Sequence, residues 1–167
     1  LLSSRKEAVA SHLESWKVFH VEPEKVSSVP VALCEFVSTF LSPEKCLLVL
    51  HIGTLETTCC LVKEGKLLAS FTRPDGLNSL FDSQKNEGEK CLERSEEEWD
   101  SLIKEKNSPL SAAVCRLQKE IAKICYALSK ECRGGSIDGI ILTGDVVKYD
   151  NLCHVLLKDL RFPILSL

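Results

Sequence analysis

The feature that most constrains the fold is the segment 46–71, in which three apolar runs are separated by short turns. The runs are Leu47–Leu50, Thr57–Val62 and Leu67–Phe71, and the turns are Ile52–Thr54 and Glu64–Gly65. Short apolar runs bounded by glycine-containing turns predict β-strands, here joined as a meander. The backbone N–H groups of the turn at Gly53, together with its small hydroxyl side chains, can bind an anion such as phosphate.

Helical periodicity flanks this meander on both sides. Expected helices cover 3–15, Val31–Leu41, 108–132 and Asn151–Leu160, and further strands are expected at Val18–Val21, Gly139–Thr143 and Phe162–Leu167. Pro30 suits the first turn of the second helix, whose apolar residues lie nearly all round it and predict burial on most sides. Ser108 or Ser111 can cap the third helix, and Asp150 the fourth. Helices and strands in this order predict an α/β fold.

The stretch from about 82 to 107 is acidic, with nine Asp or Glu against five Lys or Arg. Trp99, Leu102 and Ile103 predict a one-sided helix in its second half. A solvated helical insertion is the simpler interpretation, and an acidic docking site is the alternative.

Composition excludes several classes of function. The net charge of −3 argues against general nucleic-acid binding. No apolar run reaches 18 residues, so no membrane-spanning helix is expected.

Nine cysteines without a Cys-x-x-Cys pair predict reduced core thiols in a cytoplasmic protein, rather than a metal or disulfide framework. The chain starts at Leu1, has no methionine and shows no leader, so we expect it to be an internal or C-terminal piece of a longer cytoplasmic protein.

Two distant segments carry a family resemblance. HIGTLETTCCLVKEGKLLASFTR (51–73) resembles the phosphate-binding hairpin of actin-like ATPases, and IILTGDVVKYDNLCHVLLKDL (140–160) resembles their adenosine-binding segment. The upstream VEPEKVSSVPVALCEF (21–36) is also similar. The chain looks like the second half of an actin-like ATPase. Within this superfamily it is most similar to the PilM and FtsA groups and to cytoplasmic domains of type II secretion systems.

The resemblance implies a fold and a site. The implied fold is α/β and actin-like (ribonuclease H-like), a mixed sheet flanked by helices with the acidic insertion at about 82–107. Residues 1–45 would end a first lobe, and 46–167 would form the second. The implied degenerate nucleotide site comprises His51, Gly53, Thr54, Thr57, Thr58, Gly144 and Asp145. Thr57 and Thr58 alternate along a strand, so at most one of them can face a ligand.

The chain departs from the family pattern where the chemistry is concentrated. His51 stands where the family has the aspartate that orders metal-bound water, and Mg²⁺ prefers oxygen ligands to imidazole nitrogen. Glu56 would repel a triphosphate, and Asp145 replaces one glycine of a pair. His51 also has a simpler interpretation, as a hydrogen-bonded residue at the end of a buried strand. The remaining histidines, His12, His20 and His154, form no metal-binding spacing.

These departures predict a scaffold without catalytic, metal or resident cofactor sites. It would dock protein partners, such as inner-membrane components or its own copies, at the cytoplasmic face of the membrane in a type IV pilus or type II secretion-like assembly, without binding nucleic acid. Two alternatives stay open. One is an active ATPase or kinase that binds ATP and Mg²⁺, and the other is an unrelated α/β interaction domain.

Overall fold

The computed structural model describes residues 6–20, 23, 25–41, 44–82, 92–105, 108–132 and 135–165. The helices are α1 (Lys6–Lys17), α2 (Val29–Phe40), α3 (Asn78–Phe81), α4 (Glu96–Lys104), α5 (Pro109–Ser129), η2 (Asp145–Lys148, a 3₁₀ turn) and α6 (Asp150–Leu157). The strands are β1 (Cys46–Ile52), β2 (Thr57–Lys63), β3 (Lys66–Arg73), β4 (Gly139–Thr143) and β5 (Ile164–Leu165). This order confirms the predicted α/β fold and its meander.

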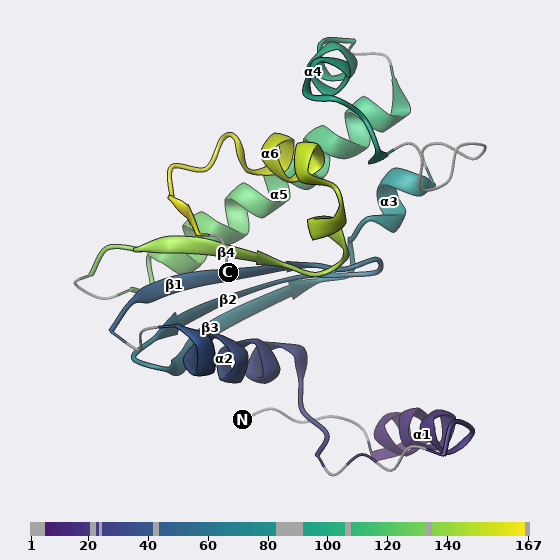
Figure 1. The fold of residues 1–167 in the computed structure, drawn as a ribbon, viewed down its shortest axis with the longest axis vertical. Helices are drawn as coiled ribbons and strands as arrows, with labels where there is room; N and C mark the ends of the chain where they lie inside the picture. The colour runs from purple at the N-terminus through teal and green to yellow at the C-terminus, as the bar shows by residue number, and fades with distance from the viewer. Residues whose placement is uncertain are drawn as a thin grey trace.

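The strands form one mixed sheet in the order β3-β2-β1-β4-β5. β1, β2 and β3 are antiparallel neighbours, whereas β4 lies parallel to β1 on its other side and β5 lies parallel to β4. Figure 1 shows α2 against one face of the sheet and α5 and α6 against the other. The helices on both faces explain why β1 is a continuous apolar run rather than an alternating one.

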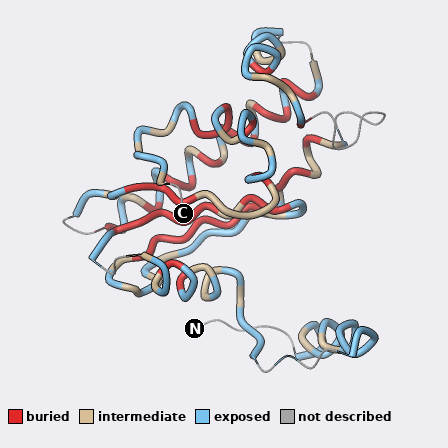
Figure 2. Tube along the Cα trace, in the orientation of Figure 1, coloured by how far each residue is buried: buried red, intermediate tan, exposed pale blue. Residues whose placement is uncertain are grey.

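Two apolar cores result, one on each face of the sheet. Leu48 and Leu50 of β1 belong to the larger core, which α5 and α6 cover, whereas Leu47 and Val49 belong to a smaller core under α2. Figure 2 shows buried residues running through the central strands and along the inner side of α5. We call these the α5-side core and the α2-side core.

The α5 helix forms where its apolar periodicity predicted it. Ser108 caps its first turn by accepting a hydrogen bond from the Ser111 N–H, and Pro109 occupies a first-turn position where no N–H partner is lost. Its buried residues recur every three or four positions from Leu110 to Leu128. The helix therefore lays one apolar stripe along the sheet.

Three sequence expectations are wrong. In the expected strand Val18–Val21, residues 18–20 form a turn in which Val18 and Phe19 are exposed, and Val21 lies outside the described residues. In α2 only Cys34 and Val37 are buried, because the helix covers the sheet as a single outer layer with one face in solvent. Asp150 does not cap α6: it is the first residue of the helix, Tyr149 takes the cap position, and no side-chain capping bond forms.

The acidic stretch contains the predicted one-sided helix, α4. Ser95 and Glu98 form a reciprocal capping box at its start, and three glutamates occupy its first turn, which suits the positive end of the helix dipole. Trp99 is fully buried against the α5-side core. Residues 83–91 and 106–107, and the 166–167 end of the expected last strand, lie outside the described residues.

Candidate functional site

The turn between β1 and β2 is closed by its own backbone. The Gly53 N–H donates to the Glu56 carbonyl at 2.9 Å, and the Gly53 carbonyl accepts from the Leu77 N–H at 3.0 Å. The Thr54 carbonyl accepts from the Asn78 N–H at 2.9 Å. The glycine N–H that could hold an anion is therefore already occupied within the turn, and the turn is anchored to the start of α3.

The second candidate turn lies directly beside the first. β4 pairs with β1 so that Thr143 is opposite His51, which brings Gly144 onto the end of β1. Gly144 has φ +94°, and a Cβ added there would lie 2.5 Å from the Ile52 carbonyl oxygen. Only glycine combines this backbone conformation with this close approach. The two segments that carry the family resemblance thus meet at one corner of the sheet.

A carboxylate from the chain itself joins the two turns. The Thr54 hydroxyl donates to Asp145 Oδ2 at 2.7 Å, and Lys148 Nζ lies 3.3 Å from Asp145 Oδ1. The Thr54 hydrogen bond and that from Lys148 hold the pKa of Asp145 below its usual range. The Thr54 hydroxyl, which was expected to approach a phosphate, is therefore hydrogen-bonded to a carboxylate of the chain itself.

A polar row crosses the sheet beside this corner, on the side that α2 covers. In register across β3, β2, β1 and β4 stand Thr72, Thr58, His51 and Thr143. The Thr58 and Thr72 hydroxyls lie 2.9 Å apart, and His51 Nδ1 lies 3.1 Å from the Thr143 hydroxyl. The contact with Thr143 gives the imidazole a polar partner at the end of a buried strand.

Thr57 is separated from this row. Its hydroxyl donates to the Asp75 carbonyl at 2.7 Å, and it is buried. Among the seven sequence-predicted site residues, the structure brings His51, Gly53, Thr54, Gly144 and Asp145 to one corner and Thr58 to the adjoining row. Thr57 instead fixes the loop that follows β3.

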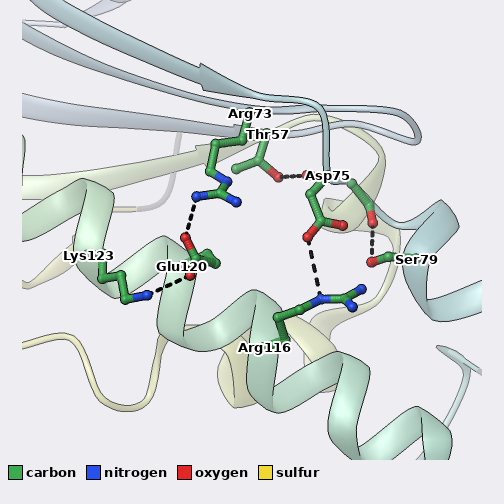
Figure 3. Close-up of polar contacts among 8 residues, drawn as sticks. Thr57, Arg73, Asp75, Ser79, Arg116, Glu120 and Lys123 are labelled. Carbon is green, nitrogen blue, oxygen red and sulfur yellow. Dashed lines mark hydrogen bonds and ion pairs between the residues drawn. The ribbon is translucent and has the colours of Figure 1, made fainter.

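No sequence pattern predicted the polar network that connects this loop to α5. Arg73 and Lys123 both contact Glu120 of α5, at 2.5 and 2.7 Å, and Arg116 lies 3.7 Å from Asp75 (Figure 3). The hydrogen bond from Lys123 and the charge of Arg73 hold the pKa of Glu120 below its usual range. Opposite charges on β3 and α5 were visible in the sequence, but their pairing depends on how the helix lies across the sheet.

Gly76 completes the corner. A Cβ there would lie 2.4 Å from the Gly53 carbonyl oxygen and 2.7 Å from that of Thr54. The loop that follows β3 is therefore in close backbone contact with the turn between β1 and β2. Ser79 donates to the Gly76 carbonyl and holds the loop from the other side (Figure 3).

The donor set does not fit a magnesium nucleotide. His51 Nδ1 faces Thr143, and Asp145 is already bonded to Thr54 and Lys148. In the part of the chain that the structure describes, no three His, Cys, Asp or Glu side chains are grouped to hold a metal ion. A cavity of about 440 Å³ lies at the far end of the β2–β3 hairpin, lined in part by Lys63 and Glu131.

Comparison with known proteins shows similarity in structure alone. No protein-family model and no curated protein sequence matches the chain. The chain superimposes on a protein of the PilM–PilN type IV pilus biogenesis complex with a TM-score of 0.71, at 20% identity, over 96% of this chain and 47% of that one. Superposition on acetate kinase from Entamoeba histolytica gives a TM-score of 0.52 at 14% identity, over 78% of this chain and 43% of that one.

A third similar structure carries a bound nucleotide analogue. The activator of 2-hydroxyisocaproyl-CoA dehydratase from Clostridium difficile, with bound ADPNP, gives a TM-score of 0.51 at 14% identity, over 86% of this chain and 62% of that one. The chain has the actin-like fold. The predicted fold class, a mixed sheet with helices on both faces and an acidic helical insertion, is therefore confirmed.

The chain spans less than two thirds of the length of each of these actin-like proteins. Within the described residues, no helix has the length and apolarity needed to cross a bilayer.

Proposed function

We propose that this chain is a non-catalytic actin-like scaffold that works through protein contacts. The observation that carries the proposal is the hydrogen bond from Thr54 to Asp145, which joins the two turns of the corner with a carboxylate. A phosphate bound between these turns would have to displace that carboxylate or lie beside it. Two anions at that spacing repel each other, although solvent weakens the repulsion because the Asp145 side chain is 44% exposed.

Two further features support the loss of phosphate chemistry. The Gly53 N–H is satisfied by the Glu56 carbonyl. His51 takes the place of the expected metal-associated carboxylate and is engaged with Thr143. Phosphoryl transfer depends on metal ions and on donors aimed at the transferred group, and among the described residues no three His, Cys, Asp or Glu side chains are grouped to hold a metal ion.

The proposed partners are components of a type IV pilus or type II secretion-like assembly, met at the cytoplasmic face of an inner membrane, with self-association as a second mode. Structural similarity to a protein of a PilM–PilN complex supports a protein partner. Exposed aromatic side chains on α2 offer a surface, since Phe36 and Phe40 pack on each other with ring centroids 5.0 Å apart and lie toward solvent.

We further propose that residues 1–45 end a first lobe and that 46–167 form a second, with the insertion at about 82–107. In this division α2 would connect the lobes while lying on the sheet of the second. The α2-side core, which includes Cys34 and Val37 together with residues of β1 and β2, supports that placement.

The alternative function is ATP binding, with or without hydrolysis. Its support is the contact between Gly144 and the end of β1 beside Gly53, together with the ADPNP bound to a structurally similar activator. In that case Asp145 would release Thr54 when nucleotide arrives.

Thermal unfolding with and without MgATP separates the two functions. The scaffold predicts no change in Tm at millimolar MgATP, because a ligand stabilises a fold only by binding its native state. The full-length protein should be used, together with the variant Asp145→Ala, which removes the carboxylate. A saturable rise in the wild-type Tm of several degrees would overturn the proposal. Affinity capture of the full-length protein should also recover inner-membrane assembly components, and recovery of metabolic enzymes alone would contradict the partner proposal.

A further inference from the structure

Four cysteines face one another across the contact between α5 and the sheet. The Sγ atoms of Cys46 and Cys132 lie 2.8 Å apart, and those of Cys59 and Cys125 lie 4.0 Å apart. All four belong to the α5-side core. The first pair joins the start of β1 to the turn after α5, at the end of the sheet away from the candidate site, and the second lies deeper under the same helix.

The backbone of the first pair is held in place on both sides. The Cys46 N–H donates to the Asp138 carboxylate at 2.7 Å, and the Asp138 N–H donates to the Cys46 carbonyl at 2.8 Å. The Cys132 N–H donates to the Ser129 carbonyl, and its own carbonyl accepts from Gly135. The two sulfurs are thus presented to each other by fixed segments, which favours a bond between them over bonds to outside thiols.

Exposure distinguishes the two pairs. Cys46 and Cys132 keep 4% and 6% of their surface in solvent, whereas Cys59 and Cys125 keep none. The first pair is therefore the more accessible of the two to an external oxidant. We propose that Cys46 and Cys132 are a redox modification site, which forms a reversible intramolecular disulfide on reaction with a small disulfide such as oxidised glutathione.

The chemistry proceeds by two exchanges. The thiolate of one cysteine attacks a sulfur of oxidised glutathione, whose S–S bond breaks and releases one glutathione thiolate. The thiolate of the other cysteine then attacks the protein sulfur of this mixed disulfide and releases the second glutathione. Two protein thiols lose two electrons, one oxidised glutathione gains them, and the two thiol protons end on the two reduced glutathione molecules.

The surroundings of the pair make this reaction slow at neutral pH. Burial and the hydrogen bond with Cys132 raise the pKa of the Cys46 thiol to about 12, and the Asp138 carboxylate acts in the same direction. The Lys63 ammonium acts against them. Because the thiolate is the attacking form, oxidation should accelerate as the pH rises from 7 to 9.

Peptide mapping of the folded protein tests the proposal. The protein is incubated with oxidised glutathione, free thiols are alkylated, and the chain is cut at glutamate and aspartate without reduction. Glu56 separates Cys46 from Cys59 and Cys60, and Glu131 directly precedes Cys132, so each cysteine of the pair falls on its own peptide. The expected result is a single crosslinked species that joins these two peptides and disappears on reduction.

Thermal unfolding gives a second measurement. A crosslink between positions 86 apart in sequence should raise Tm by about 5–10 °C, and reduction should reverse the rise. Cys132→Ser should abolish both the crosslink and the rise. The matched control, Cys115→Ser within α5 and outside the pair, should keep both.

The wild-type mapping decides the matter even where a variant fails to fold. Separate alkylation of Cys46 and Cys132 after prolonged oxidation at pH 9 would overturn the proposal. So would glutathione retained on either cysteine, or a crosslink that joins Cys59 to Cys125 in place of the proposed pair.

Discussion

The two faces of the sheet differ in kind. On the side of α5 and α6, β1 contributes Leu48, Leu50 and Ile52 to a core that is apolar along the whole strand. On the side of α2 the apolar layer includes Leu47 and Val49 and then gives way to the polar row through His51. The α5-side face is therefore apolar along its full length. The α2-side face is apolar at first and becomes polar toward the candidate site.

This difference shows where the chain can vary at little cost. A thick apolar core tolerates few polar substitutions, because each unpaired polar group buried there is costly. The thinner layer on the α2 side ends in threonines and a histidine, whose polar groups already have neighbouring polar partners. On the α2 side, His51 therefore has a local hydrogen-bond partner in Thr143.

The sharpest comparison uses neighbouring leucines of β1. Leu48→Ala, in the α5-side core, should lower the free energy of unfolding by about 4 kcal/mol, because the surrounding core leaves a cavity. Leu47→Ala, in the thinner α2-side core, should cost about 2 kcal/mol, since α2 can settle onto the smaller side chain. Both leucines are at most 1% exposed, so burial alone does not separate them. Urea unfolding measures both values, and equal losses would break the comparison.

A smaller effect is expected where the two turns meet. Gly144→Ala should lower the free energy of unfolding by about 2–3 kcal/mol, because of φ +94° and the 2.5 Å approach to the Ile52 carbonyl. Gly53→Ala is the control. The nearest atom to an added Cβ there lies 3.4 Å away and its φ is not positive, so a loss under about 1 kcal/mol is expected. If Gly53→Ala proved the costlier change, the described geometry of the corner would be wrong.

The polar row should contribute less still. Thr58→Val keeps the shape of a fully buried side chain and removes its hydrogen bond to Thr72, which should cost about 1 kcal/mol. Thermal unfolding at pH 7 measures the change. A loss as large as that of Leu48→Ala would show that the row is a structural element comparable to the main core.

The smallest expected effect concerns Asp145 and pH. Its pKa is lowered in the folded chain, so its stabilising contribution is present above the pKa of the unfolded state, near 4, and is lost as the pH falls through the lower folded value. Because the side chain is 44% exposed, solvent screens the interaction, and Asp145→Asn should cost less than about 0.5 kcal/mol at pH 7. The stabilities of the two proteins should converge once the pH falls below the lowered pKa of folded Asp145, and a difference that stays constant throughout the acid range would exclude this origin.

The sequence predicted the elements that depend on local pattern. The three meander strands, the α5 helix with its Ser108 cap, and the β4 strand follow from apolar periodicity and turn residues. The Val18–Val21 strand and the buried α2 were wrong, because an apolar run records the preference for burial but not whether another element is present to cover it.

The candidate site was predictable only in part. Glycines after two strands indicated two turns, and the resemblance placed them together. The closing contacts, from Thr54 to Asp145 and from Arg73 to Glu120, join residues 91 and 47 positions apart, so no local pattern predicts them. Gly76 must lack a Cβ because the backbone of the first turn lies against it, and no local pattern shows that contact.

Site-resolved NMR titration tests the central claim most directly. Backbone amide signals of Gly53, Thr54, Gly144 and Asp145 are followed in ¹⁵N-labelled full-length protein as MgADPNP is added to several millimolar. If the carboxylate of Asp145 keeps the two turns joined, these signals should stay in place within experimental error. Saturable shifts confined to these four residues and their neighbours would contradict the account and establish a working nucleotide site.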